Sequence, residues 1–203
     1  MKKTVLREYA RLIVRKGVNV QKGQEVLIYA GLDQPEFVAM VAEEAYRAKA
    51  KKVTVEWNYQ PLTVLHSRYQ TVKTLGQVPE WTEKRQEEWC ETMPARIHLV
   101  SEDPDGLKKA NMEKLAKGRQ LSYPVLKPYI DRRNGSQQWC SAAVPGAAWA
   151  KKVFPGERTS TAIEKLWEAI IFCSRVDGDA CAAWDRHNAE LHARCRYLND
   201  LHI

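Results

Sequence analysis

The sequence predicts an α/β domain with a mostly parallel sheet of about four or five strands, flanked by helices. Short apolar runs typical of strands alternate along the chain with segments of helical periodicity. The first two runs, 25–30 and 51–57, enclose one helical segment within about thirty residues, which is the size of a βαβ unit. Two amphipathic helices are predicted at the C-terminal end of the chain.

The first predicted element is an amphipathic helix near the start of the chain. Leu6, Tyr9, Ala10 and Ile13 recur at the i, i+3, i+4, i+7 spacing of one helix face. Gly17 is expected to end this helix, because glycine adopts the backbone conformation that commonly follows a last turn.

The βαβ unit follows. The run EVLIYA (25–30) is short and mostly apolar, as expected of a strand buried on both faces. Asp33 is predicted to cap the next helix, with Glu36 completing a capping box. KKVTVEW (51–57) then predicts the second strand, parallel to the first and joined by a right-handed crossover.

The middle of the chain continues the alternation. Residues 61–75 and 79–93 are predicted helices, and the second places Trp81, Arg85 and Trp89 on one face. They precede the third predicted strand.

That strand is ARIHLVS (95–101). Asp103 is predicted to cap a helix with Pro104 in its first turn, where a missing N–H costs nothing. After a basic, polar stretch, QQWCSAAV (137–144) predicts a fourth strand.

Beyond Pro155 the sequence predicts two amphipathic helices that need a surface to bury against. Thr161 and Glu164 are spaced as a capping box at the start of the first. The two apolar stripes consist of Ile163, Leu166, Trp167, Ile170 and Ile171, and of Trp184, His187, Leu191, Cys195 and Leu198.

Composition restricts the class of protein. No apolar run approaches the ~20 residues of a membrane helix, and Arg7, Glu8 and Arg11 interrupt any signal-peptide core. The five cysteines are odd in number, widely spaced and without a C-x-x-C, which argues against a disulfide framework or a zinc knuckle. These features favour a soluble protein of the reducing cytoplasm.

A net charge of +7 keeps nucleic acid among the possible partners. The basic residues are nevertheless spread along the chain and mixed with acids, and no RRM, KH or zinc-finger signature occurs. A solvated helix surface is therefore favoured over a nucleic-acid patch.

The common catalytic motifs are missing from the sequence: G-x-G-x-x-G, the P-loop and G-x-S-x-G do not occur. His187 and His192 are five positions apart, so on a helix they point in different directions and do not form a zinc pair. His66, His98 and Cys140 are interpreted as packing residues, because no activating neighbour is evident.

A ligand groove is predicted where the strands end. Asp33, Asn58, Glu102 and Asp103 follow predicted parallel strands, and open α/β sheets bind ligands at that edge. The three carboxylates within residues 101–105 could hold a metal, but helix capping is the favoured interpretation. No catalytic residue or metal ligand is assigned to this chain.

The segment AAVPGAAWAKKVFPG (142–156) is interpreted as a structural corner rather than a ligand loop. Trp149 and Phe154 are expected to contribute buried area. Lys151 and Lys152 are its only candidates for contact with a substrate.

Several separated motifs resemble one known family. QWCSAAVPGAAWAKKVFPG (138–156), the following AIEKLWEAIIFCSRVDGDACAAWDRH (162–187) and the early YARLIVRKGVNVQKGQEVLI (9–28) resemble the thermophilic-type metalloaminopeptidases, which include aminopeptidases T, S and PepS. The likeness extends from about residue 4 to the end. Ser141 and Gly146 depart from the family's common choices, which leaves the geometry of that loop open.

The resemblance implies a cytoplasmic, usually dimeric enzyme that removes amino-terminal residues from peptides with two divalent metal ions (zinc, cobalt or manganese). It also implies that the metal ligands lie in a second, carboxyl-terminal domain. Residues 1–203 are therefore expected to form the amino-terminal α/β domain, to shape part of the substrate cavity and the oligomer contact, and to be inactive alone. A stand-alone α/β binding module and a basic nucleic-acid binder remain the alternatives.

Overall fold

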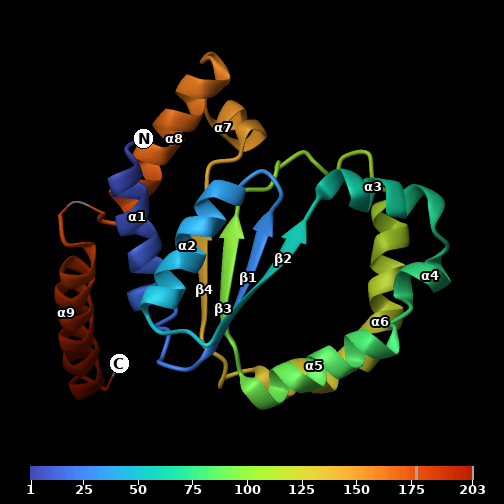
Figure 1. Ribbon diagram of the computed structural model, residues 1–203, viewed down its shortest axis with the longest axis horizontal. Coiled ribbons are helices and arrows are strands. Elements are labelled where there is room, and N and C mark those ends of the chain that lie inside the picture. The colour runs from blue at the N-terminus through green and yellow to red at the C-terminus, as the bar shows by residue number, and fades with distance from the viewer. Residues whose placement is uncertain (177, 203) are drawn as a thin grey trace.

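The computed structural model describes residues 1–176 and 178–202, and it confirms the α/β fold (Figure 1). The described part contains one sheet of four parallel strands in the order β2-β1-β3-β4. The strands are β1 (Glu25–Gly31), β2 (Lys52–Asn58), β3 (Ala95–Val100) and β4 (Trp139–Ala143). The helices are α1 (Lys3–Leu12), η1 (Ile13–Gly17), α2 (Pro35–Arg47), α3 (Gln60–Tyr69), α4 (Val72–Gly76), α5 (Glu80–Thr92), α6 (Met112–Arg133), α7 (Ala147–Val153), α8 (Thr159–Cys173) and α9 (Ala180–Asp200).

The strand order creates a switch point between β1 and β3. The chain leaves β1 toward β2 on one side, whereas it leaves β3 toward β4 on the other. The loops that follow these two neighbouring strands therefore diverge, and open α/β sheets bind ligands in the crevice that this divergence leaves.

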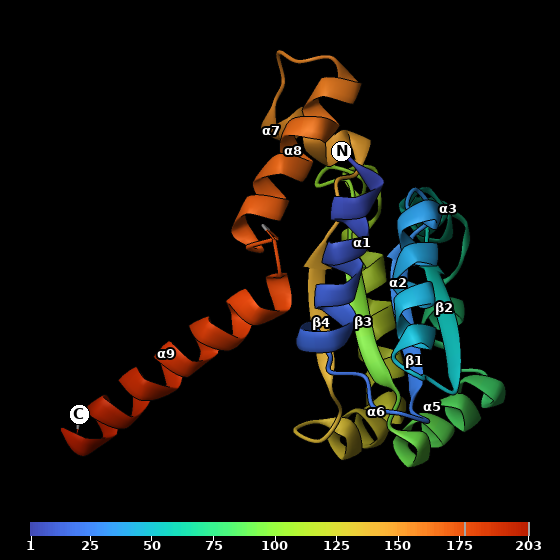
Figure 2. The same ribbon diagram turned by 60° about the vertical axis from the view of Figure 1, so that its left-hand side comes forward.

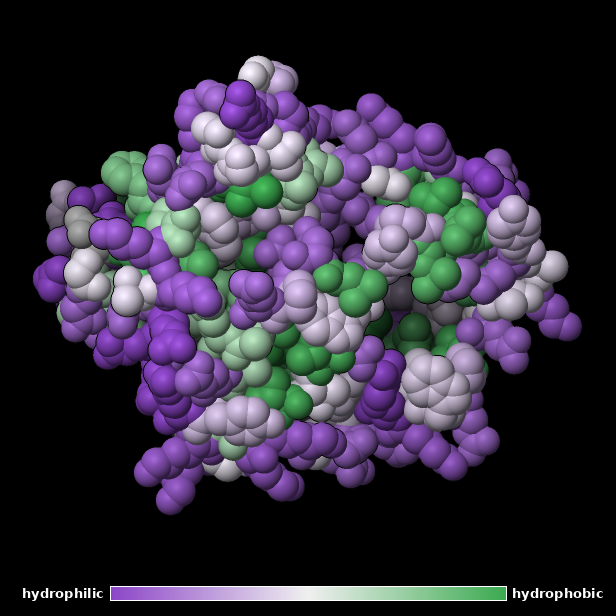
Figure 3. All heavy atoms as spheres, turned by 45° about the horizontal axis from the view of Figure 1, so that its top comes forward, coloured by the Kyte–Doolittle hydropathy of each residue, from purple (hydrophilic) through white to green (hydrophobic). Residues whose placement is uncertain are grey.

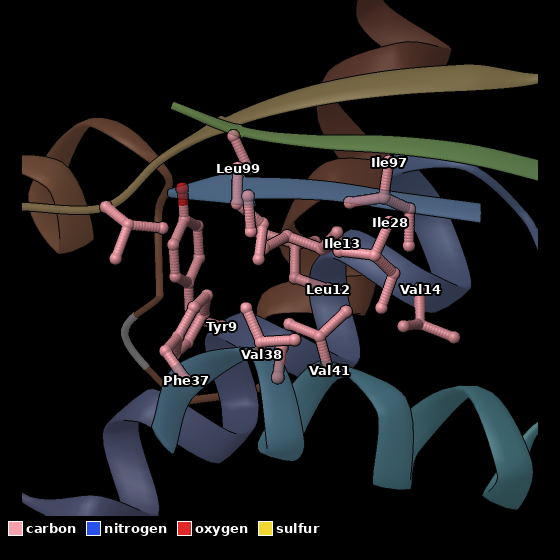
Figure 4. Close-up of a cluster of buried hydrophobic side chains, with 14 of the residues drawn as sticks. Tyr9, Leu12, Ile13, Val14, Ile28, Phe37, Val38, Val41, Ile97 and Leu99 are labelled. Carbon is pink, nitrogen blue, oxygen red and sulfur yellow. The ribbon is translucent and has the colours of Figure 1, made fainter. Parts of the chain in front are cut away.

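The main core lies between one face of the sheet and the helices α1, η1 and α2. Ile28 and Ile97 are fully buried on this face. In Figure 4 their side chains point from the strands toward the helices of the core. Tyr9, from α1, stacks on Phe37 from α2 with ring centroids 5.7 Å apart. The predicted first helix face is thus confirmed as core, and Gly17 does end the helical segment, whose last turn is a π-helix.

The opposite face of the sheet is more polar. Tyr29, Glu56 and His98 are cross-strand neighbours there, and the rings of Tyr29 and His98 stack 4.7 Å apart. Arg85 from α5 reaches this face and donates to the Glu56 carboxylate at 2.7 Å.

The helix predicted over 61–75 is two helices in the structure. Gln70 is extended, and the Thr71 hydroxyl accepts a hydrogen bond from the Thr74 backbone N–H, so that α4 begins as a separately capped helix. Gly76 of α4 and Gly118 of α6 allow the two helices to approach closely, because a Cβ at Gly118 would lie 2.8 Å from the Leu75 Cβ.

The prediction that Asp103 caps a helix beginning at Pro104 is wrong. Residues 104–109 form turns, and the Asp103 carboxylate accepts instead from the Asp105 backbone N–H at 2.9 Å. The next helix, α6, begins at Met112 with Asn111 as its cap. It includes the basic stretch and continues through two internal prolines, Pro124 and Pro128.

The two terminal helices are present, but the predicted capping box is wrong. Helix α8 begins at Thr159, so Thr161 already lies inside it, and the residue before it, Arg158, makes no side-chain cap. Leu166, Trp167 and Ile170 are buried as predicted.

Helix α9 differs from its prediction. It extends away from the sheet (Figure 2), and of the described residues in this helix only Ala180 is buried. Leu191 and Leu198 of its apolar stripe are exposed rather than packed. None of the helices that the structure describes is both long enough and apolar enough to cross a membrane.

Candidate functional site

A cavity of about 210 Å³ lies at the carboxyl ends of β1, β2 and β3. Its wall includes all four residues predicted for a groove: Asp33, Asn58, Glu102 and Asp103. Three strands bring them together, because the carboxyl ends of parallel strands meet at one edge of the sheet. The structure therefore places a cavity at the edge of the sheet where a groove was predicted.

Asp33 and the neighbouring Gln34 connect the loops that follow β1, β3 and β4. Its carboxylate accepts from the Ser101 hydroxyl at 2.9 Å and from the Gln34 side-chain amide at 3.0 Å. The same Gln34 amide donates to the Pro145 carbonyl at 3.1 Å. Asp33 therefore does not cap α2, and Gln34, which occupies the cap position, makes no side-chain cap bond.

Glu102 and Asp103 are held differently. The Glu102 carboxylate accepts from the Ser101 backbone N–H at 3.2 Å and from the Asn58 amide at 3.5 Å. Gln60 forms a reciprocal pair with the backbone of Asp103: it accepts from the N–H at 2.9 Å and donates to the carbonyl at 3.0 Å. These bonds fix the loop after β3 against the start of α3.

Two glycines allow the backbone to close around this site. A Cβ at Gly146 would lie 2.1 Å from the Ser101 carbonyl oxygen. A Cβ at Gly31 would lie 2.4 Å from an Asp33 carboxylate oxygen and 2.7 Å from the Ser101 hydroxyl. The contact between Asp33 and Ser101 therefore requires glycine at both positions.

The charge of the cavity favours a cationic group. Asp33, Glu102 and Asp103 line it, and among the described residues no lysine or arginine does. Three carboxylates without a lining cation attract positively charged groups, and a protonated amine is one of them. Figure 3 tilts this end toward the viewer and shows hydrophobic atoms among hydrophilic ones over this face.

The cavity is small for a complete site. Ligand pockets usually measure ≈ 300–1,000 Å³, whereas this one has about 210 Å³. It can hold an amino group with one side chain, but a peptide would need further walls.

The acidic residues of the cavity do not fit a metal centre. A catalytic zinc site needs about three protein ligands that converge on one point. Asp33 and Glu102 already accept hydrogen bonds from Ser101 and its neighbours, and no group of three or more His, Cys, Asp or Glu side chains in the described ranges could hold a metal ion.

The histidines considered from sequence lie outside the cavity. His98 stacks on Tyr29, and its pKa is lowered by burial and by the nearby Arg96 charge. His66 is half-buried on α3. His187 packs edge-on against Trp184 on α9, whereas His192 is exposed.

Cys140 is a packing residue, as predicted. Its side chain is half-buried against the core, and burial raises the pKa of the thiol. Its strand is the edge of the sheet, however, and the preceding Trp139 is 59% exposed.

The 142–156 segment packs against the core and also lines the cavity. Gly146 and the first turn of α7 line the cavity, which the interpretation as a purely structural corner did not include. Trp149 and Phe154 are half-buried against the core rather than fully buried.

The two lysines of this segment have protein partners. Lys151 donates to the backbone carbonyls of Pro155 and Glu157. Lys152 donates to the Asp105 carboxylate at 2.7 Å and, with Lys108, lowers the pKa of that carboxyl. Neither lysine lines the cavity.

Sequence reasoning missed Gln60, Ser101 and the two glycines. Ser101 was assigned only to the end of a strand, although it is 2% exposed and donates into the site. Gln60 follows the second strand by two residues, and that position was its only sequence signal.

The strand order and the helices around the sheet define a doubly wound α/β domain, and the cavity lies at its switch point. Comparison with known proteins then gives the family. The model of the thermophilic metalloprotease family (M29) matches residues 2–203, and the chain belongs to this family.

Several relatives are named aminopeptidases. The chain is 35% identical to aminopeptidase AmpS of Bacillus subtilis over 97% of its own length, and 32% identical to aminopeptidase T of Thermus thermophilus over 96%. In each case it spans about half of the relative, 48% of the length. The structure of wild-type AmpT from Thermus thermophilus matches with a TM-score of 0.84 at 30% identity, over 97% of this chain and 49% of that one.

Proposed function

We propose that residues 1–203 form the amino-terminal domain of a metal-dependent aminopeptidase, which removes amino-terminal residues from peptides. The domain shapes part of the substrate cavity and does not hold the metals. Membership of a metalloprotease family and the names of the relatives support the reaction class.

The observation that carries the proposal is the acidic cavity at the switch point. An aminopeptidase must recognise the free α-amino group of its substrate, which is largely protonated near neutral pH. Asp33, Glu102 and Asp103 provide negative charge around a cavity that fits such a group. Its small volume agrees with a site that a second domain completes.

The metals belong to the other half of the proposed enzyme. Two divalent ions, zinc, cobalt or manganese, would bind there, polarise the scissile carbonyl and activate a water. The contribution of this chain is to bind and orient the substrate amine. A homodimer in the cytoplasm is part of the proposal, and the five free cysteines are compatible with a reducing compartment.

Substrate kinetics test the role of the cavity. The chain would be fused to the half of Bacillus subtilis AmpS that it does not match, and leucine release from a leucyl dipeptide would be measured. Glu102→Gln keeps the shape but removes the charge, so it should raise KM about five- to tenfold, the loss of one partly screened charged contact.

The matched control is Glu91→Gln, an exposed carboxylate on α5 far from the cavity wall. It should leave KM unchanged. Equal kinetics for wild type and Glu102→Gln would contradict a role of this cavity in binding the substrate amine, even if the fusion is an active peptidase.

A further inference from the structure

A second cavity lies at the opposite end of the sheet, near the amino ends of β3 and β4. It has a volume of about 80 Å³. Arg96 of β3 and Arg133 of α6 line it, with Gln137 and Trp139 beside them. It shares no lining residue with the acidic cavity.

Each guanidinium group has one buried nitrogen without a hydrogen-bond partner. Arg133 donates one N–H, from Nη2, to the Gln86 side chain at 2.6 Å, but its buried Nη1 has no partner. The buried Nε of Arg96 also has no partner. Burying an N–H without an acceptor is unfavourable, and more so for a charged group.

Neither arginine is neutralised by a carboxylate. Within the described ranges, no Asp or Glu oxygen lies within 4.0 Å of a nitrogen of Arg96 or Arg133. The neighbouring Arg85 also has a buried Nε without a partner, but it pairs with the Glu56 carboxylate at 2.7 Å. Of these three guanidinium groups, only Arg85 has a carboxylate partner among the described residues, so the two that line the cavity have no counterion there.

Aromatic packing holds two of these arginines, Arg85 and Arg133, in place. The Trp89 ring is 9% exposed, with the Arg85 guanidinium carbon 4.8 Å and the Arg133 guanidinium carbon 5.9 Å from its centroid. Such cation–π contacts restrict the side chains without neutralising them. On the sheet, the Arg96 charge adds to burial in lowering the pKa of His98, as expected in a positive local field.

We propose that the cavity between Arg96 and Arg133 binds a small inorganic oxyanion of the phosphate or sulfate type. Guanidinium groups present planar pairs of N–H donors that match the oxygens of such an anion. The volume suits one small anion and is far below the ≈ 300 Å³ at which ordinary ligand pockets begin. Bound there, the anion would connect β3 to the end of α6 and stabilise the fold.

Thermal unfolding with inorganic phosphate tests this site. Phosphate at about 20 mM, against sodium chloride of equal ionic strength, should raise the Tm of the wild-type chain by about 3 °C more than that of an Arg96→Gln/Arg133→Gln variant. The comparison between proteins is necessary because phosphate stabilises folded proteins generally. Sulfate should compete with phosphate in isothermal titration calorimetry.

The matched control is Arg132→Gln, an exposed arginine next to Arg133 on α6. It should keep the full phosphate effect, and Arg96→Lys should keep only part, because lysine retains the charge but not the planar donor pair. If the double variant does not fold, titration of the two single variants decides the question.

Two results would overturn the proposal. The first is a phosphate effect that is equal in wild type, the double variant and the control. The second is a wild-type chain that self-associates without binding phosphate and loses self-association in the double variant, because the two arginines would then bind a carboxylate of a second copy.

Discussion

The Ser101 hydroxyl donates a hydrogen bond to the Asp33 carboxylate at 2.9 Å, and this contact joins the loops that follow β1 and β3 across the switch point of the sheet. Ser101 is buried, whereas Asp33 is exposed on its other side and lines the cavity. The pair therefore links the stability of the sheet to the position of a carboxylate in the site.

Removing the hydroxyl tests this link. Ser101→Ala should lower the free energy of unfolding by about 1 kcal/mol, the usual net value of one hydrogen bond, because Asp33 can still be solvated. Urea unfolding measures the change. Ser136→Ala, at an exposed turn, should be neutral, and equal stability of the two variants would mean that the bond between Ser101 and Asp33 contributes nothing.

The backbone approach at Gly146 gives a second prediction. Gly146→Ala should destabilise the chain by about 1–3 kcal/mol, because the new methyl group would overlap the Ser101 carbonyl oxygen 2.1 Å away. Gly156→Ala is the matched control, since a Cβ there meets nothing within 4 Å. It should be neutral or slightly stabilising. Equal denaturation midpoints for the two variants would exclude the close approach at Gly146.

Trp149 gives a third prediction. Because its ring is half-buried, Trp149→Ala should cost about 1–3 kcal/mol, below the 3–5 kcal/mol typical of a fully buried tryptophan. Phe172→Ala, at a ring 83% exposed on the following helix, should change stability by less than about 0.5 kcal/mol. A Trp149 variant as stable as wild type would show that the ring is not part of the packed structure.

The buried phenol of Tyr9 gives a pH prediction. Burial raises its pKa to about 12, and the hydroxyl donates to the Ala143 carbonyl at 3.1 Å. The unfolded chain loses this proton near pH 10, so the contribution to stability is complete below pH 10 and is lost as the pH rises toward 12. At pH 11 the loss should be about 1.4 kcal/mol relative to pH 8.

Tyr9→Phe isolates this effect, because every other titrating group is shared with wild type. Urea unfolding at pH 8 and pH 11 should show a stability loss that is larger in wild type by that amount. Parallel losses in the two proteins would mean that Tyr9 titrates normally.

The fold could be predicted largely because the spacing of apolar residues along the sequence follows which side chains are buried in each helix and strand. The run 25–30 is mostly apolar because β1 is a central strand of the sheet and its core face is covered by helices. The groove could be predicted because parallel strands bring Asp33, Asn58 and Glu102 to the same edge.

The local capping rules failed where other contacts intervened. Asp33 satisfies the pattern of a cap, but its carboxylate accepts from Ser101, sixty-eight positions away, which no local pattern contains. The cap predicted at Thr161 is wrong for a simpler reason, because α8 begins two residues before it. Periodicity alone also could not establish that α9 is buried, since an apolar stripe on a helix does not specify which surface covers the stripe.

Chelator-sensitive leucine release, measured for this chain alone and for its fusion to the unmatched half of AmpS, tests the central claim most directly. With zinc, cobalt or manganese, the chain alone should release no leucine from a leucyl dipeptide, because its described residues bring no metal-binding set together. The fusion should release leucine and lose this activity with chelator. Metal-dependent turnover by the 203-residue chain would contradict the proposed location of the metals, and an inactive but folded fusion would contradict the assignment as half of an aminopeptidase.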